Sequence, residues 1–91
     1  MAVGRAQRRA ERRARFAEEF GTKAETALDL VDLLELAWHD CYGEITPPDR
    51  VIEDVLVCAR GSLERLIKTA LLAVTDWRDL RLAADDVRNG R

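Results

Sequence analysis

Hydrophobic residues in positions 24–42 recur three and four apart, which is the spacing of an amphipathic α-helix. At 100° per residue they fall in one arc of roughly half the helix circumference. The members of that arc are Ala27, Leu30, Val31, Leu33, Leu34, Ala37, Trp38, Cys41 and Tyr42. An apolar face this wide is more than one neighbouring helix can cover, so the pattern predicts a helical bundle.

A second apolar face of the same period runs through residues 47–74 and predicts one long helix there. The start signal is TPPD, with Thr46 as N-cap, Pro47 at the first helical position and Asp49 at the third. Gly43 suits the end of the helix before it. Gly61-Ser62 would bend or break the long helix at a cost of about 1 kcal/mol relative to alanine. We nevertheless expect a single helix, which forms an antiparallel hairpin with residues 24–42.

The regions outside this hairpin are predicted as a basic N-terminal helix, a short C-terminal helix and a frayed tail. Counting from the turn sets Leu71 and Leu72 opposite Phe16 and Phe20, so we expect the phenylalanines to dock on those leucines. The division is then a projecting basic arm over 1–15, a single helical domain over 16–88 and a tail over 89–91. The last helix is expected to begin at Thr75 or Asp76.

Composition agrees with an all-α protein, since 35% of the residues are charged and helix-forming residues dominate. A chain of 91 residues is one small domain with little margin of stability, which a second copy would improve. Several hydrophobic residues interrupt otherwise polar helix faces. We therefore predict a homodimer or a protein partner, with a contact surface of Leu36, Val57, Leu71 and Leu72.

Charge is divided unevenly along the chain. Residues 1–15 hold six arginines and one glutamate, leaving nine basic and sixteen acidic residues for positions 16–91. A basic segment on an acidic body is typical of an interaction surface. The candidate residues for binding an anion or a partner are Arg5, Arg8, Arg9, Arg12, Arg13 and Arg15.

Four targets of these arginines are open: an acidic protein, nucleic acid bound without sequence preference, water, or the acidic surface of a second copy. A membrane surface is disfavoured because the opposite face of the segment is mostly alanine. Sequence readout is disfavoured because no aromatic residue lies among the arginines to stack on bases. A membrane span is not expected, because no apolar run is long enough.

Reactive residue types gather at positions 38–44, WHDCYGE. Successive helical residues point about 100° apart, so His39, Asp40 and Cys41 cannot converge on one substrate atom. One histidine and two distant cysteines do not make a structural zinc site. The register also separates Cys41 from Cys58 too far for a disulfide. We expect no enzyme activity, metal or cofactor, and a cytoplasmic protein with reduced thiols.

Acidic residues of the first helix are interpreted as a solvated face rather than as catalytic or cation-binding carboxylates. They are Asp29, Asp32, Glu35 and Asp40. The sequence thus predicts a non-catalytic helical interaction or regulatory module that binds an acidic protein partner or self-associates. The alternative is a non-specific nucleic-acid-binding protein that uses the arginine helix.

Overall fold

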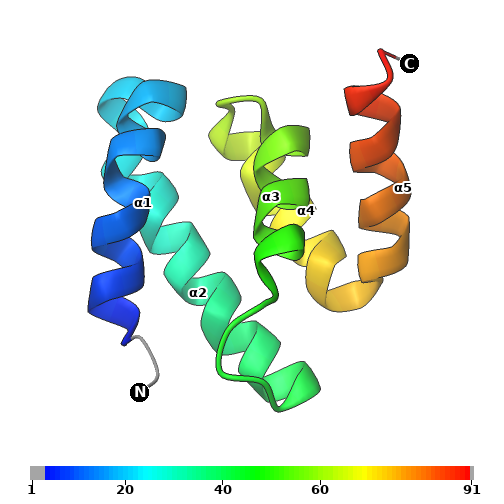
Figure 1. Cartoon of the computed structure of the whole chain (residues 1–91), viewed down its shortest axis with the longest axis horizontal. Helices are drawn as coiled ribbons and strands as arrows, with labels where there is room; N and C mark the ends of the chain where they lie inside the picture. The colour runs from blue at the N-terminus through cyan, green and yellow to red at the C-terminus, as the bar shows by residue number, and fades with distance from the viewer. Residues whose placement is uncertain (1–3, 91) are drawn as a thin grey trace.

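The computed structural model describes residues 4–90 and confirms an all-α bundle (Figure 1). Position 91 of the predicted tail and positions 1–3 of the predicted arm lie outside this range. The elements are α1 (Arg5–Phe20), the 3₁₀ turn η1 (Gly21–Lys23), α2 (Ala24–Tyr42), α3 (Asp49–Ala59), α4 (Leu63–Thr75) and α5 (Trp77–Arg88).

The helices form two packed groups, α1 with α2 and α3 with α4 and α5. The groups meet where α2 packs against α4. α1 folds back along α2, while α3 packs against both α4 and α5 (Figure 1). The Tyr42 hydroxyl donates a hydrogen bond to the Val74 carbonyl at 3.1 Å, which sets the C-terminal ends of α2 and α4 side by side. These two helices therefore run in the same direction. The predicted antiparallel pairing of 24–42 with 47–74 is wrong in this respect, because an additional reversal precedes α4.

That reversal is the break at Gly61, where the predicted 47–74 helix is in fact two helices. Arg60 and Gly61 have φ of 51° and 74°, both in the left-handed region. A Cβ on Gly61 would lie 2.4 Å from the Glu19 carbonyl oxygen of α1, so the position requires glycine. The Ser62 hydroxyl then caps α4 by accepting a hydrogen bond from the Arg65 amide. The apolar period continued through the break because α3 and α4 both face the core.

The phenylalanines are buried as expected, but not on the predicted partners. Phe16 and Phe20 lie 5.4 Å apart between ring centroids and are 0% and 6% exposed. Leu71 instead leaves 65% of its surface exposed, and Leu72 is half-buried. The predicted docking failed because its register assumed the antiparallel hairpin.

Helix ends follow the sequence signals in two places and depart from them in one. Gly43 ends α2 with φ of 74°, and Asp76 caps α5 by accepting hydrogen bonds from the Arg78 and Asp79 amides. Thr46 is not an N-cap, because α3 begins at Asp49 after Pro48. Its hydroxyl donates instead to a buried carboxylate of α2, described below. The core takes residues from every helix, including Phe16, Leu28, Val55, Leu66 and Leu80.

Candidate functional site

A buried carboxylate, Glu35 of α2, is the centre of the contact between α1 and α2. Its side chain is 0% exposed. Arg8 binds it with both ends of its guanidinium, Nε to Oε2 at 2.7 Å and Nη2 to Oε1 at 3.1 Å. Arg12 Nη1 and the Thr46 hydroxyl donate to Oε2 at 3.1 and 2.9 Å. Arg5 Nε lies 3.5 Å from Oε1. One carboxylate is therefore held by three arginines and a hydroxyl.

Two opposing effects act on the Glu35 carboxyl. Burial, the largest, raises its pKa because the charged form loses hydration. Hydrogen bonds from Arg8, Thr46 and Arg12 lower it and together outweigh the burial, so the net pKa lies below the ordinary value of 4.5. The group is thus an anion at neutral pH, and it holds the first half of α1 in place.

The neighbouring arginines of α1 bind the outer acidic residues of α2. Arg9 contacts Glu25, Asp29 and Asp32 at 2.7, 2.8 and 2.7 Å. Arg13 also bridges to Glu25. Hydrogen bonds from Arg9 and then Arg13 hold the Glu25 pKa below its ordinary value, and the hydrogen bonds that Arg9 donates to Asp32 and Glu25 raise the pKa of Arg9.

Arg15 connects α1 to α3. Its Nη1 and Nη2 bind the two carboxylate oxygens of Glu53 at 2.5 and 2.9 Å, and its Nε binds Glu19 at 2.5 Å. The Glu53 pKa is held below its ordinary value, chiefly by the hydrogen bond from Arg15. Arg15 is thereby the link between the two packed groups of helices on this side of the molecule.

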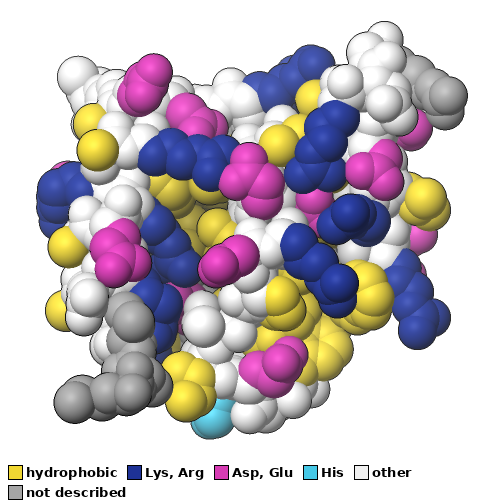
Figure 2. Space-filling view, in the orientation of Figure 1, with side chains coloured by type: hydrophobic (Ala, Val, Ile, Leu, Met, Phe, Trp, Pro, Cys, Tyr) yellow, Lys and Arg dark blue, Asp and Glu magenta, His cyan; other side chains and the backbone are white. Residues whose placement is uncertain are grey.

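All six arginines predicted as a binding surface have a carboxylate partner in the same chain. Arginine and acidic side chains lie side by side over α1 and α2 in Figure 2. The predicted arm does not project, because it is part of α1 and lies along α2. The sequence-based interpretation missed that the acidic partner is intramolecular.

Glu35 was wrongly placed on a solvated face. The available signal was its helical neighbourhood: Leu28, Val31 and Trp38 stand seven before, four before and three after it, and all are buried. An acid surrounded by core positions, in a chain with an adjacent arginine-rich helix, indicates a buried ion pair. The interpretation as a surface carboxylate overlooked that spacing.

A second buried carboxylate binds the C-terminal helix. Asp54 of α3 is 2% exposed and binds Arg88 of α5, with 2.7 Å between Oδ1 and Nη2. Arg81 Nη1 lies 3.7 Å from its Oδ2. Asp54 could not be recognised as buried from local sequence, because its arginine partners come from α5, more than 25 residues away along the chain.

An apolar groove of about 190 Å³ lies between α2 and α4. Leu33, Ile67 and Leu71 on its walls are 60%, 53% and 65% exposed. Its lining is aliphatic throughout: Leu30, Leu33, Leu34, Ala37, Ile67, Ala70, Leu71 and Val74.

Of the four predicted contact residues, only Leu71 lines this groove. Leu36 is 45% exposed and follows Leu33 by three positions on α2, while Val57 and Leu72 are half-buried. The structure therefore does not bring the four residues into one patch. The α2 wall of the groove consists of Leu30, Leu33, Leu34 and Ala37, which the sequence pattern placed in the apolar arc of residues 24–42.

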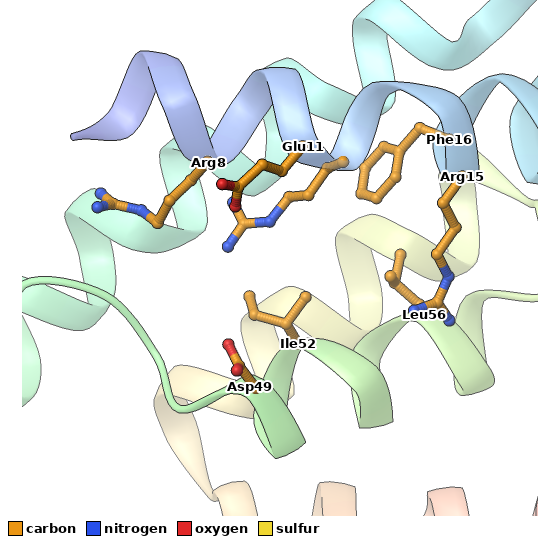
Figure 3. Close-up of a pocket in the computed structure, with 8 residues that line it drawn as sticks. Arg8, Glu11, Arg15, Phe16, Asp49, Ile52 and Leu56 are labelled. Atoms are coloured by element: carbon orange, nitrogen blue, oxygen red, sulfur yellow. The ribbon is translucent and has the colours of Figure 1, made fainter. Parts of the chain in front are cut away.

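A pocket of about 450 Å³ opens between α1 and α3 (Figure 3). Arginines and an acid of α1 form one wall, and α3 supplies the other together with apolar residues at the base. The lining residues are Arg8, Glu11, Arg12, Arg15, Phe16, Asp49, Ile52 and Leu56.

The reactive residue types lie apart from these features. His39 is exposed, with Nδ1 3.3 Å from the Glu44 carbonyl oxygen. Cys41 is exposed and Cys58 half-buried, and both thiols are free. Burial and then Asp54 raise the pKa of Cys58. Within residues 4–90 no group of three or more His, Cys, Asp or Glu side chains is arranged to hold a metal ion.

None of the helices in the described range combines the length and apolar character that a membrane crossing needs. Comparison of the chain with protein-family models, with curated proteins and with solved structures found no match. Function has to be argued from the surface of this molecule alone.

Proposed function

We propose that the protein is a small helical interaction module that self-associates through the groove between α2 and α4. The observation that carries this proposal is the aliphatic lining of the groove, whose wall residues Leu33, Ile67 and Leu71 each keep more than half of their surface exposed. Removing apolar surface from water contributes about 25 cal/mol per Å². A contiguous apolar patch of this kind marks a contact site.

The ion pairs that the arginines already make favour the α2–α4 groove over the basic helix as the contact surface. An acidic protein or a nucleic acid would have to compete with carboxylates that already bind Arg8, Arg9 and Arg12. These arginines are held by carboxylates of the same chain and leave few donors for an extended polyanion, whereas the aliphatic groove is open. The apolar surface therefore has more to gain from a partner than the arginines have.

A second copy is the occupant that the geometry fits best. A two-fold axis along the groove places α2 of one copy over α4 of the other, and because α2 and α4 run in the same direction all four helices are then parallel. The result is a four-helix arrangement with a self-complementary interface.

Sedimentation velocity over a concentration series tests this proposal. We expect the wild type to dimerise and Leu71→Asp to raise the dimer Kd at least about tenfold, because a carboxylate in an apolar interface loses hydration without gaining a partner. Leu82→Asp is the matched control. Leu82 is also 65% exposed but lies on α5, outside the groove.

Two results would contradict the proposal. One is a wild type that stays monomeric up to about 0.5 mM, well above the Kd expected of a specific dimer. The other is an equal effect of Leu82→Asp and Leu71→Asp, which would show that any added surface charge disrupts association.

A further inference from the structure

The pocket between α1 and α3 has an apolar base that is part of the core. Phe16, Leu56 and Ile52 are 0%, 2% and 7% exposed, so packing holds these walls in place. Its volume of about 450 Å³ falls in the range of small-molecule sites. Figure 3 shows Ile52 and Phe16 facing this space from opposite helices.

Positive charge is concentrated on the α1 wall. The side chains of Arg8 and Arg12 are only 12% and 17% exposed, and both bind the same carboxylate, Glu35. Because Arg5 approaches Glu35 as well, one negative charge is shared among three positive ones. Glu35 alone therefore does not neutralise this wall, and Glu11 and Asp49 of the pocket add two further negative charges.

Arg12 has hydrogen-bonding capacity left for an anion. Among residues 4–90 it hydrogen-bonds to Glu35 alone, through Nη1 at 3.1 Å. A guanidinium carries five N–H donors in a planar fork that suits carboxylate and phosphate groups. Since Arg12 lines the pocket, its remaining donors lie beside the empty volume.

Two carboxylates restrict what the pocket accepts. Glu11 and Asp49 line it from α1 and α3, on opposite sides in Figure 3. Glu11 is exposed and hydrogen-bonds to Gln7 at 3.4 Å. Their charge repels an extended polyanion but leaves room for a single anionic group close to Arg12.

We propose that this pocket binds a small amphipathic anion. One carboxylate or phosphate head contacts Arg12 and the Arg8 edge of the wall, and a short apolar body lies over Ile52, the most exposed of the three base residues at 7%. The site is separate from the α2–α4 groove, because the two share no lining residue. The proposal therefore does not depend on self-association.

Calorimetric titration of the full chain with hexanoate, hexyl phosphate, hexanol, hexylammonium and inorganic phosphate tests the site. We expect saturable one-to-one binding of hexanoate or hexyl phosphate, with the tighter of the two identifying the head group. The other three probes should bind at least about tenfold more weakly. Hexanol or hexylammonium binding as tightly as hexanoate would overturn the role of the arginines. Equal binding of inorganic phosphate would overturn the role of the apolar base.

Variants of the two charged walls should act in opposite directions. Arg12→Gln is expected to weaken binding of the better probe about tenfold, and Arg12→Lys to weaken it less. Glu11→Gln should tighten it about twofold to threefold by removing repulsion, whereas Glu18→Gln, exposed on the same helix outside the pocket, should leave it unchanged.

Glu11→Gln also serves if Arg12→Gln does not fold, since Glu11 is exposed and contributes only a long hydrogen bond. Unchanged or weaker binding by Glu11→Gln overturns the proposal. So does the absence of saturable binding by both anionic hexyl probes.

Discussion

The two ends of the chain attach to the bundle by the same device in different surroundings. Each terminal helix offers arginines to a buried carboxylate of an inner helix, α1 to Glu35 and α5 to Asp54. Arg8 and Arg12 at the first site are 12% and 17% exposed, whereas Arg88 and Arg81 at the second are 35% and 48% exposed. The first cluster is enclosed, and the second opens to water on the arginine side.

The two helices also differ in what else holds them. α5 buries Leu80 and Ala84 completely, with Trp77 packed at its start. α1 buries only Phe16 and Phe20, both in its last turns, so its first half is attached mainly by ion pairs. Exposed ion pairs contribute little, but a buried pair that loses one partner costs several kcal/mol. We therefore expect charge to determine the stability of the α1 contact far more than that of the α5 contact.

The largest expected effect is that of Glu35→Gln. The substitution keeps the shape of the side chain but leaves Arg8 and Arg12 without their counter-charge in a largely dehydrated site. We expect a loss of about 3 kcal/mol in the free energy of unfolding, measured by urea denaturation. Hydrogen exchange should also accelerate in the first half of α1.

Glu64→Gln is the matched control for that measurement. Glu64 is 79% exposed and pairs only with Lys68 within the described chain, so its loss should stay under about 0.5 kcal/mol. If Glu35→Gln lost less than about 1 kcal/mol, the buried cluster would not be the main attachment of α1.

Asp54→Asn should have a smaller effect of about 1–2 kcal/mol. Its carboxylate is as deeply buried, but Arg88 and Arg81 can turn to water when the charge is removed. Hydrogen exchange should accelerate in α5 and stay unchanged in α1, and Asp40→Asn at an exposed position of α2 should alter neither helix. An effect equal to that of Glu35→Gln would remove the distinction between the two ends.

Local patterns predicted helices well and helix neighbours poorly. The period of residues 24–42 predicts α2, and Gly43 and Asp76 mark helix ends correctly. The break at Gly61 depends on the approach of Glu19, a contact between positions 42 residues apart, and no local pattern contains it. Helix propensity alone places the cost of that glycine at about 1 kcal/mol, which is too little to decide between one helix and two over residues 47–74.

The candidate sites required long-range information in the same way. Counting charge predicted a basic surface that binds an acidic partner, and it could not show that these arginines pair with carboxylates of α2 in the same chain. The groove between α2 and α4 needs the direction of α4, which follows from the Gly61 break. Leu33 and Leu71 are therefore recognisable as one surface only once the fold is known.

Acid should weaken the attachment of α1, and at moderate pH this is the smallest of the expected effects. Glu35, Glu25 and Glu53, all partners of α1 arginines, have folded-state pKa values below the ordinary 4.5. The unfolded chain then binds more protons than the folded one, so their contribution is complete above about pH 4.5 and declines as pH falls through the folded-state values.

Glu35→Gln removes one of these groups, so its stability deficit relative to the wild type should shrink between about pH 6 and about pH 3. Urea denaturation of both proteins across that range measures the deficit at each pH. A deficit that stayed constant would mean that Glu35 acts through shape and hydrogen bonding rather than charge. The claim that charge holds α1 in place, in contrast to the apolar contacts that hold α5, would then be wrong.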